Sequence, residues 1–388
     1  MKVVYVSYDG ALDPLGATQV VPYLIGLATR GVRITLVSFE KQKAWLRTST
    51  VATMSDRLEA SGIRWKPLRY HKLFRTVATS YDICRGSRVA ASEALTSGAS
   101  LIHCRGDVAM AMGRWAALRS SARLLYDVRG LFSDERVEAG SWTRGSLIDR
   151  TVRRLEAANL RAASGLVALT DVTVKVLGAR GPALPPHRVI PTCADLSVFK
   201  PRAAREMPDY GLVYSGSLGS WYMTREMVAF ARLARRAVPG RVLFLTPHVA
   251  EAREAGASPD WADVRTVDAS EVPSWLRRAR ALLFFIRPTP AKRASCPTKL
   301  AEGLACGLPI VCNRGIGDLD SFVEKEKVGI LVESVSESGY EEATDRLTRL
   351  LQDPDLPARC RRIAESRYDL ESAVDRYLGL YREICSGA

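Results

Sequence analysis

Short apolar runs alternate with longer amphipathic segments along the first 190 residues. Residues 3–7 are rich in β-branched side chains and predict a strand, whereas apolar residues at helical spacing over 19–29 predict a helix. The alternation continues with strands at 34–38, 101–103, 124–128, 165–169 and 189–191, and helices at 108–120, 146–163 and 171–177. Near-continuous apolar strands separated by helices are typical of a parallel sheet covered on both faces, so we predict a doubly wound α/β domain.

A second series of the same kind follows residues 200–210, which lack periodicity and carry two prolines, as a linker does. It predicts strands at 212–215, 242–246, 264–267, 281–286 and 309–312, and helices at 224–237, 274–280, 298–306, 340–352 and 371–384. We therefore expect two similar α/β domains in tandem. Ligands of such sheets bind beyond the carboxyl ends of the strands. Two domains facing a central cleft would suit an enzyme that joins two substrates.

Composition narrows the class of protein without deciding its function. The 388 residues are 47% apolar and 25% charged, as in folded soluble domains. Subtracting 42 acidic from 56 basic residues gives +14, which suits an anionic partner or a solvated basic face equally well. Eight cysteines without a C-x-x-C pair, and four histidines without zinc-site spacing, argue against a zinc site. We expect a reducing, cytoplasmic location and no transmembrane span.

The segment 295–312 carries the most specific chemistry. Thr298 is a plausible N-cap for a helix over 298–306, and the N–H groups at that helix start would attract a diphosphate. Lys299 adds a positive charge there, and Glu302 lies on the same helix face, where it can accept both hydroxyls of a ribose. The alternative is an ordinary capped helix with an ion pair between these two side chains.

This segment resembles the donor-site signature of the family 4 glycosyltransferases, through Pro297-Thr298-Lys299-Leu300-x-Glu302 followed by Ala305-Cys-Gly-Leu-Pro309. Three weaker matches follow the family's order: 213–218, 189–201 and 367–381. The resemblance implies a GT-B fold of two tandem Rossmann-like domains facing a central cleft. It places the acceptor domain at 1–200, the donor domain at 201–365 and a helix crossing back to the first domain at 366–388.

The sequence also departs from the family pattern at positions that bind the donor. The first acid of the family's E-x7-E pair falls at Ala294, and its usual Arg and Lys after the glycine loop fall at Ser217 and Tyr222. Other groups must then neutralise the diphosphate, and the candidates are Lys299, Arg225, Arg287, Lys292 and Arg293, with backbone N–H groups of Gly216, Ser217 and Gly219. The predicted donor-binding residues are Gly16, Gly216, Ser217, Arg225, Arg287, Pro297, Thr298, Lys299, Leu300 and Glu302.

In the first domain, charged residues gather where predicted strands end. The loop from Asp9 to Gly16 follows the first strand and is not a G-x-G-x-x-G, which disfavours a nicotinamide site. Many relatives place a histidine, which contacts the transferred sugar, where this chain has Arg129. An arginine cannot act as a general base, so we hypothesise an anionic sugar or a phosphorylated acceptor. The predicted acceptor-binding residues are Asp9, His103, Arg105, Arg129, Asp134 and Glu135, and the predicted catalytic residues are Lys299, Arg129 and Asp13.

The resemblance implies a metal-independent, retaining transfer of a hexose from a UDP- or GDP-sugar to a polysaccharide, lipid-linked or natural-product acceptor, without a cofactor. The same fold could instead invert or epimerise its substrate, with Asp9, Asp13 or His103 as a base. A basic module that binds nucleic acid or membranes is a remote alternative, since the charges are scattered and aromatic residues are few. Arg150, Arg153, Arg154 and Arg161 could touch anionic lipids at the inner face of the membrane.

Overall fold

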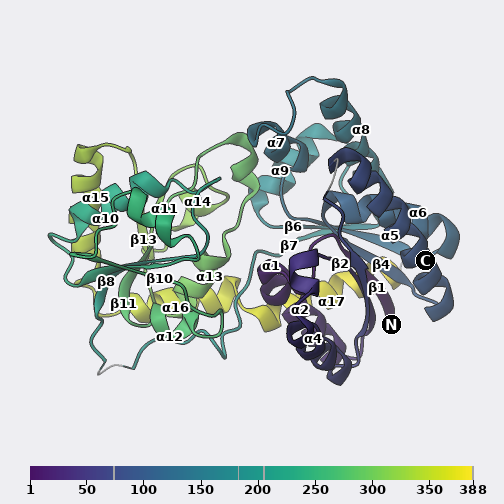
Figure 1. Cartoon of the computed structure of the whole chain (residues 1–388), viewed down its shortest axis with the longest axis horizontal. Helices are drawn as coiled ribbons and strands as arrows, with labels where there is room; N and C mark the ends of the chain where they lie inside the picture. Colours follow the sequence, from purple (N-terminus) through teal and green to yellow (C-terminus); the bar gives the residue numbers. More distant parts are fainter. Residues whose placement is uncertain (73–74, 182, 204–205, 387–388) are drawn as a thin grey trace. The chain divides into compact units, whose positions relative to one another are not determined.

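The chain divides into two compact units in the computed structural model, which describes residues 1–388 except 73–74, 182, 204–205 and 387–388 (Figure 1). The first unit comprises Met1–Ile190 with Leu370–Ala388, and the second comprises Pro191–Asp369. We predicted the first boundary after residue 200. It falls earlier because Ile190 still donates a backbone hydrogen bond to Ala168, whereas Ala194 already bonds to Tyr368 of the second unit.

The first unit is built on a seven-stranded sheet in the order β3-β2-β1-β4-β5-β6-β7, in which every neighbouring pair is parallel. Its strands are β1 (Lys2–Ser7), β2 (Arg33–Glu40), β3 (Arg64–Arg69), β4 (Leu101–Arg105), β5 (Arg123–Val128), β6 (Gly165–Ala168) and β7 (His187–Val189). The order reverses between β1 and β4, so the point at which ligands of open sheets usually bind lies beyond the carboxyl ends of these two strands.

Helices cover this sheet. They are α1 (Pro14–Gln19), α2 (Val21–Thr29), α3 (Gln42–Trp45), α4 (Thr48–Ala60), α5 (Arg75–Ser97), α6 (Gly106–Ser120), α7 (Phe132–Glu138), α8 (Leu147–Ala162), α9 (Asp171–Arg180) and α17 (Leu370–Ser386). The sequence pattern missed α1, α3, α4, β3, α5 and α7. In β3, charged residues and Pro67 sit on an edge strand, and α5 is polar on most of its surface, so neither shows a clear apolar period.

The second unit repeats the arrangement with six parallel strands in the order β10-β9-β8-β11-β12-β13. They are β8 (Tyr210–Ser215), β9 (Arg241–Leu245), β10 (Ala262–Arg265), β11 (Ala279–Phe284), β12 (Ile310–Asn313) and β13 (Gly329–Val332). The helices are α10 (Thr224–Ala234), α11 (Val249–Glu254), α12 (Val272–Leu276), the 3-10 helix η1 (Pro290–Ala294), α13 (Thr298–Ala305), α14 (Leu319–Phe322), α15 (Glu337–Leu350) and α16 (Leu356–Arg367). The prediction of two doubly wound parallel sheets is confirmed. The sequence pattern did not predict α11, η1, α14, β13 or α16.

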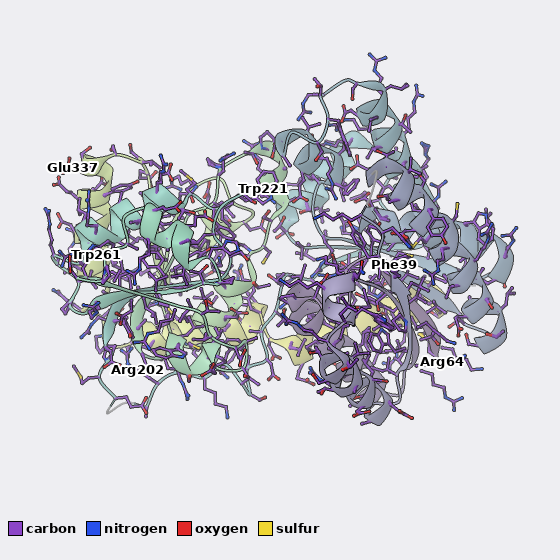
Figure 2. The ribbon with its side chains drawn as sticks, viewed as in Figure 1. Phe39, Arg64, Arg202, Trp221, Trp261 and Glu337 are labelled. Atoms are coloured by element: carbon purple, nitrogen blue, oxygen red, sulfur yellow. The ribbon has the colours of Figure 1, made fainter. Side chains whose placement is uncertain are left out.

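Each unit has its own apolar core. In the first, β-branched and aromatic side chains of the central strands are buried, among them Val4, Val37 and Phe39 (Figure 2). In the second, Leu212, Phe244 and Leu283 are fully buried between the helix layers. Burial of side chains on both faces of each sheet explains why the strands read as continuous apolar runs.

The C-terminal helix α17 packs on the first unit. Arg30 of the loop after α2 binds Glu371 at 3.0 Å and Asp375 at 2.5 Å. Gly26 lets the two helices approach closely, because a Cβ there would lie 2.7 Å from a methyl of Val374. The tyrosines Tyr377 and Tyr381 extend from α17 to the polar groups at the sheet. The helix begins at Leu370, one residue before the start that the apolar spacing predicts and four residues after the boundary at 366 that the resemblance implies.

Within the described residues, no helix combines the length and the apolar character needed to cross a bilayer. All eight cysteines lie in described residues, and the structure forms no disulfide between them.

Asp107 gives a testable dependence of stability on pH. It lies buried in the first turn of α6, where the Tyr126 hydroxyl donates to it, and burial, reinforced by the charge of Glu156, raises its pKa to about 7. A raised pKa in the folded state means that stability falls as the pH rises toward 7, because the folded protein must then bury a charge. Asp107→Asn is therefore expected to raise the free energy of unfolding by roughly 2 kcal/mol at pH 8 and by less at pH 5.

Chemical denaturation at both pH values measures this difference. An equal gain at the two pH values, or a loss of stability at pH 8, would contradict the assignment of Asp107 as a protonated buried carboxyl.

Candidate functional site

The start of α13 lies at the carboxyl edge of the second sheet, since the helix follows β11 and leads into β12. Pro297 is the N-cap and Thr298 the first helical residue, so our prediction that Thr298 caps the helix is wrong by one position. Thr298 has helical backbone geometry, whereas an N-cap residue does not. Among the described residues no side chain caps the first N–H groups of this helix. The N–H of Leu300 bonds to the Pro297 carbonyl at 3.1 Å, whereas those of Thr298 and Lys299 have no partner among the described residues and are available to an anion.

Lys299 projects from the first turn of α13 into a closely packed aromatic environment. Its side chain is 4% exposed, and its Nζ has no hydrogen-bond partner among the described residues. The Nζ lies 4.2 Å from the ring centroid of Tyr214 and 3.7 Å from that of Tyr222. The two ring faces stabilise the ammonium, but they leave its N–H donors unused. A buried, unpartnered cation of this kind is suited to meet an anionic ligand.

Glu302 lies one turn further along α13 and is half-buried. Burial lowers the pKa of Lys299 to about 7 and raises that of Glu302 to about 7, while the charge of each partly offsets the effect on the other. Both groups thus titrate near neutral pH, and small changes in their surroundings decide whether they are charged. Groups with such shifted pKa values gather at functional sites.

The glycine loop after β8 packs directly against Lys299. Gly216 has a φ of +126°, and a Cβ there would lie 3.2 Å from the Lys299 Nζ, so only glycine fits without displacing the amine. The Tyr214 hydroxyl donates to the carbonyl of Ser217, which fixes the ring beneath the loop. The N–H groups of Gly216 and Gly219 already bond to the Leu245 carbonyl and the Thr224 hydroxyl. In this structure those two N–H groups, which we predicted to bind phosphate, are used within the protein.

Tyr222 is held in place by the backbone. It forms an antiparallel bridge with Ile286 just beyond β11, and Arg287 donates its N–H to the carbonyl of Trp221. Figure 2 labels Trp221. Lys292 places its Nζ 4.1 Å from the ring centroid of Trp221. The side chains of Trp221 and Tyr222 therefore face lysines of the same unit, and a role in stacking on a base or sugar stays a prediction.

The remaining predicted donor residues divide by exposure. Arg225, Arg287, Arg293 and Ser217 are exposed around this edge, so their side chains are free to reach a ligand. Pro297 is buried, and Leu300 is 1% exposed within the apolar core. The N–H of Leu300 bonds to the Pro297 carbonyl, so neither it nor the Leu300 side chain is free to meet a donor in this structure.

In the first unit, the loop after β1 is held by a carboxylate that the sequence did not single out. Glu40, at the end of β2, is 1% exposed and accepts the N–H groups of Ala11 at 2.8 Å and Leu12 at 3.1 Å. The loop closes tightly enough that a Cβ on Gly16 would lie 1.8 Å from the carbonyl oxygen of Gly10. Gly16, which we predicted to bind the donor, therefore has a packing role that any side chain would disrupt.

The acids of this loop differ in their surroundings. Asp13 binds Lys41 at 2.8 Å and its side chain is 13% exposed. Asp9 is half exposed and lies 3.6 Å from Arg105. The predicted catalytic role of Asp13 would require an ion pair with Lys41 to open.

Three of the predicted acceptor residues converge on Asp127, near the end of β5. Arg129 donates to it at 3.2 Å, Arg105 lies 3.8 Å away, and the Nε2 of His103 lies 3.4 Å away. The Tyr377 hydroxyl of α17 donates to the same carboxylate at 3.1 Å. Burial acts to raise the pKa of Asp127, but the arginines and histidine around it lower that pKa overall.

His103 itself is 1% exposed, with its Nδ1 2.6 Å from the Tyr381 hydroxyl and its ring against Tyr5. Burial lowers its pKa, so the ring is neutral. The structure thus places this predicted acceptor residue within the packing between the sheet and α17.

The remaining predicted acceptor residues lie on α7. Asp134 is 1% exposed and binds three arginines, Arg144, Arg153 and Arg180, at 3.1, 2.8 and 2.6 Å. Burial acts to raise the pKa of Asp134, but the arginines around it lower that pKa overall. A carboxylate so fully engaged joins α7, α8 and α9 and has little capacity left for a substrate. Glu135, its neighbour, is partly exposed.

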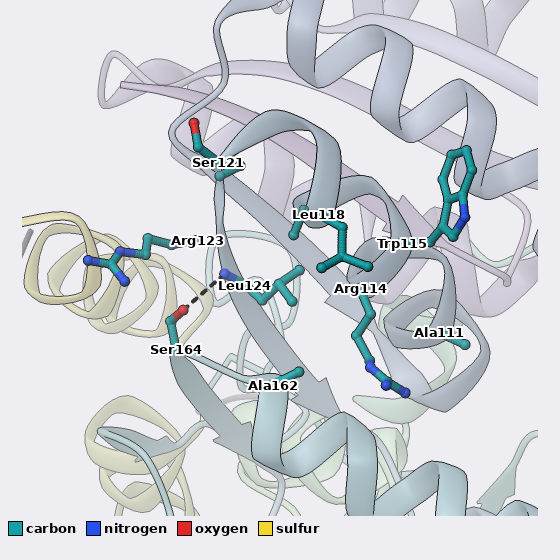
Figure 3. Close-up of a pocket in the computed structure, with 11 residues that line it drawn as sticks. Ala111, Arg114, Trp115, Leu118, Ser121, Arg123, Leu124, Ala162 and Ser164 are labelled. Atoms are coloured by element: carbon teal, nitrogen blue, oxygen red, sulfur yellow. Dashed lines mark hydrogen bonds between the residues drawn. The ribbon is translucent and has the colours of Figure 1, made fainter.

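A separate pocket of about 620 Å³ lies at the opposite edge of the first sheet. Figure 3 shows Arg114, Trp115, Leu118 and Arg123 around it, and Ser164 accepts the N–H of Leu124 at its floor. Because Arg123 begins β5, this pocket opens at the amino end of the strand, away from the residues that converge on Asp127.

Comparison with known proteins finds a family match that lies mostly in the second unit. Residues 225–377 match the family model described as glycosyl transferase-like. The matched range contains α13 with Lys299 and Glu302, and the glycosyl transferase-like match begins after the glycine loop at Gly216. No curated protein matches the chain's sequence.

Solved structures resemble the chain over its whole length. Sucrose-phosphate synthase from Thermosynechococcus elongatus has a TM-score of 0.72 at 15% identity, with 100% of both chains covered. A glycosyltransferase from Rickettsia africae has a TM-score of 0.71 at 13% identity, covering 100% of this chain and 99% of that one. Anabaena Alr3699/HepE, in complex with UDP and glucose, has a TM-score of 0.69 at 14% identity, with 98% of each chain covered.

At these identities the structural likeness shows the GT-B fold. Together with the family match in the second unit, it makes the chain an enzyme of the glycosyltransferase type. Sequence reasoning missed Tyr214, whose ring faces Lys299 in the second unit. It also missed Glu40 and Asp127, which hold the loop after β1 and the arginines in the first unit. Asp127 lies two residues before the predicted site residue Arg129, whereas no sequence signal indicates that the Tyr214 ring faces Lys299.

Proposed function

We propose that the enzyme transfers a glycosyl group from a nucleotide-sugar donor to a hydroxyl acceptor with retention of configuration. The observation that carries this proposal is the buried Lys299 ammonium at the uncapped start of α13, with unused N–H donors and Glu302 one turn away. In this assignment Lys299 and the helix N-terminus bind the diphosphate, and Glu302 accepts the ribose hydroxyls.

The nucleoside diphosphate is then the leaving group. As the glycosidic bond breaks, negative charge grows on the phosphate oxygens, and fixed positive groups that face these oxygens stabilise the transition state. Arg225 and Arg287, both exposed, are proposed to supply further charge in place of a metal ion. For a retaining transfer, we propose that a donor phosphate oxygen takes the proton of the acceptor hydroxyl on the same face of the sugar.

UDP is the first nucleotide to test, because structures of Anabaena Alr3699/HepE contain UDP and UDP-glucose. Thermal shifts with UDP-, GDP-, dTDP- and ADP-sugars are expected to show a rise of several degrees for at least one base, since a ligand that binds only the folded state stabilises it. The absence of a shift with all four would refute the donor assignment.

Product analysis by NMR tests the stereochemistry. A product with the donor's anomeric configuration supports retention. An inverted product would require a base, and Asp9 then becomes the candidate, because it is half exposed while His103 is buried and Asp13 is paired with Lys41.

Glu302→Ala is expected to weaken nucleoside diphosphate binding about 10-fold or more, because it removes two charge-assisted hydrogen bonds to the ribose. Calorimetry with UDP and with 2′,3′-dideoxy-UDP isolates this contact. The variant and the parent protein should bind the dideoxy compound alike, since it lacks both hydroxyls. Equal losses for both nucleotides would contradict the ribose role.

Nucleotide binding should also exchange protons in a pH-dependent direction. At pH 8 Lys299, with a pKa of about 7, is mostly neutral, and a diphosphate favours its charged form, so binding should take up protons. At pH 6 Lys299 is already charged, while Glu302 is mostly protonated and is driven to ionise by the ribose hydroxyls, so binding should release protons.

Calorimetry in two buffers of different ionisation enthalpy measures this exchange. In Lys299→Arg, which stays charged, the uptake at pH 8 should disappear. The same proton exchange at pH 6 and pH 8 in the parent protein would contradict the assignment.

We propose peripheral contact with anionic lipid at the cytoplasmic face through α8. Arg150, Arg154 and Arg161 are exposed and recur on one side of this helix, whose first residue, Leu147, is 80% exposed. Arg153 binds Asp134 and Asp149 instead, and is left out of this surface. Co-sedimentation with vesicles that contain phosphatidylserine should fall when these three arginines are replaced by glutamine; unchanged binding would refute the contact.

A further inference from the structure

Strands β4 and β5 end in the same way. Arg105 is the last residue of β4 and precedes Gly106, while Arg129 directly follows β5 and precedes Gly130. In the sheet, Arg105 is paired with Ser7 of β1 on one side and Asp127 of β5 on the other. The two arginines therefore lie at the carboxyl edge of the first sheet, beside the reversal of strand order between β1 and β4.

Both guanidinium groups are buried without full use of their donors. The Arg105 side chain is 3% exposed and that of Arg129 is 14% exposed. The Nε of each is buried without a hydrogen-bond partner among the described residues. Arg105 lies near Asp127 at 3.8 Å and near the Tyr5 hydroxyl, but its ion pairs are longer than a hydrogen bond. Unsatisfied buried donors are unfavourable in a folded protein and call for a bound partner.

The charges around the pair favour an anion. Asp127 is shared by both guanidinium groups, and it also accepts the Tyr377 hydroxyl, so its oxygens are already engaged. The neighbouring His103 is neutral because of its burial. Asp9 lies 3.6 Å from the Arg105 Nε with half of its side chain in solvent, so water screens its charge and an incoming anion can displace it.

The structure also leaves room beside Arg105. A Cβ added to Gly106 would meet no atom within 4 Å. Arg129 lies across Asp127 from Arg105, and two guanidinium groups at one edge of the sheet favour an anionic group over a neutral one.

We propose that Arg105 and Arg129 form a subsite for a carboxylate or phosphate group carried by a sugar substrate. The proposal rests on the proposed glycosyltransferase function and specifies its substrate class. Planar guanidinium groups bind such anions through paired N–H donors, which would satisfy the two buried Nε atoms. The anion belongs either to the transferred sugar or to the acceptor, and the experiment separates these sources.

Calorimetry on the full chain compares matched ligands. Glucose, glucuronate and glucose 6-phosphate, each in the presence of UDP, probe the acceptor side, and UDP-glucose against UDP-glucuronate probes the transferred sugar. We expect at least one anionic ligand to bind 10-fold or more tightly than its neutral partner. That ratio should fall to within twofold in Arg105→Met and in Arg129→Met, but persist in Arg119→Met, which removes an exposed arginine of the same unit.

The outcomes are distinct. Preference among the free sugars assigns the anion to the acceptor, and preference among the UDP-sugars assigns it to the transferred sugar. Equal binding of neutral and anionic ligands, or a preference that survives both methionine variants, overturns the subsite. UDP alone, titrated in parallel, reports on the donor assignment, so its failure is seen separately. If Arg129→Met does not fold, the double variant Asp127→Asn/Arg129→Met serves in its place, because it removes both charges of the Asp127–Arg129 ion pair.

Discussion

Lys299→Met is expected to lower kcat/KM for the nucleotide-sugar donor by about 100- to 1000-fold, the size of loss that follows removal of one fixed group facing the developing charge. The same substitution should stabilise the fold. Burial lowers the pKa of Lys299 to about 7. At neutral pH the lysine is charged and well solvated in the unfolded chain, whereas folding removes water from this charge, which lowers the free energy of unfolding. Replacing it with an apolar side chain of similar length should raise the free energy of unfolding by roughly 1–3 kcal/mol.

Opposite changes in activity and stability distinguish a functional lysine from a structural one. Donor kinetics and chemical denaturation of the same preparations measure both quantities. Lys325→Met serves as the control, because Lys325 is an exposed lysine of the same unit. If Lys299→Met loses stability and keeps its kcat/KM, the ammonium is part of the packing and the donor assignment falls.

Gly16→Ala is expected to destabilise the protein by about 3 kcal/mol and to lower transfer activity at the same time. The added Cβ would lie 1.8 Å from the Gly10 carbonyl oxygen and 3.1 Å from the Cα of Ala11, both backbone atoms that cannot move aside as a side chain could. The loop after β1 would have to shift, and its shift would break the bonds from Ala11 and Leu12 to Glu40. Asp9 and Asp13 move with that loop.

Gly379→Ala is the matched control, since Gly379 also lies in a helix, α17, but a Cβ there meets no atom within 4 Å. It should leave stability unchanged or raise it by up to about 1 kcal/mol, the helix propensity difference between the two residues. Thermal and chemical unfolding of the two variants measure the contrast. Comparable stability of both variants would show that the loop is not as tightly closed as the structure indicates.

The sequence predicted the fold well where apolar periodicity is strong. The central strands, buried on both faces, read as continuous apolar runs and were placed to within a few residues. The segment from 41 to 100 was not assigned, because α4 and α5 have low apolar content and β3 is an edge strand with a proline. Strand β13 was not assigned, although Gly329–Val332 is a buried apolar run like those of the predicted strands.

The candidate site could be predicted only where local spacing carries the chemistry. Lys299 and Glu302 lie three residues apart on one helix, so their proximity follows from the helical repeat. The rings of Tyr214 and Tyr222 around Lys299 depend on a loop and a bridge between distant segments, which no local pattern specifies. For the same reason the sequence could not show that Asp134 is surrounded by arginines from two other helices and the loop before α8.

The most direct test of the central claim is a crystal structure with UDP, or with whichever nucleoside diphosphate the thermal-shift panel identifies. We expect a diphosphate oxygen within about 3 Å of the Lys299 Nζ, close to the first N–H groups of α13, with the ribose hydroxyls on Glu302. A diphosphate bound elsewhere, with the Lys299 ammonium still enclosed by its two tyrosines, would contradict this account of the site.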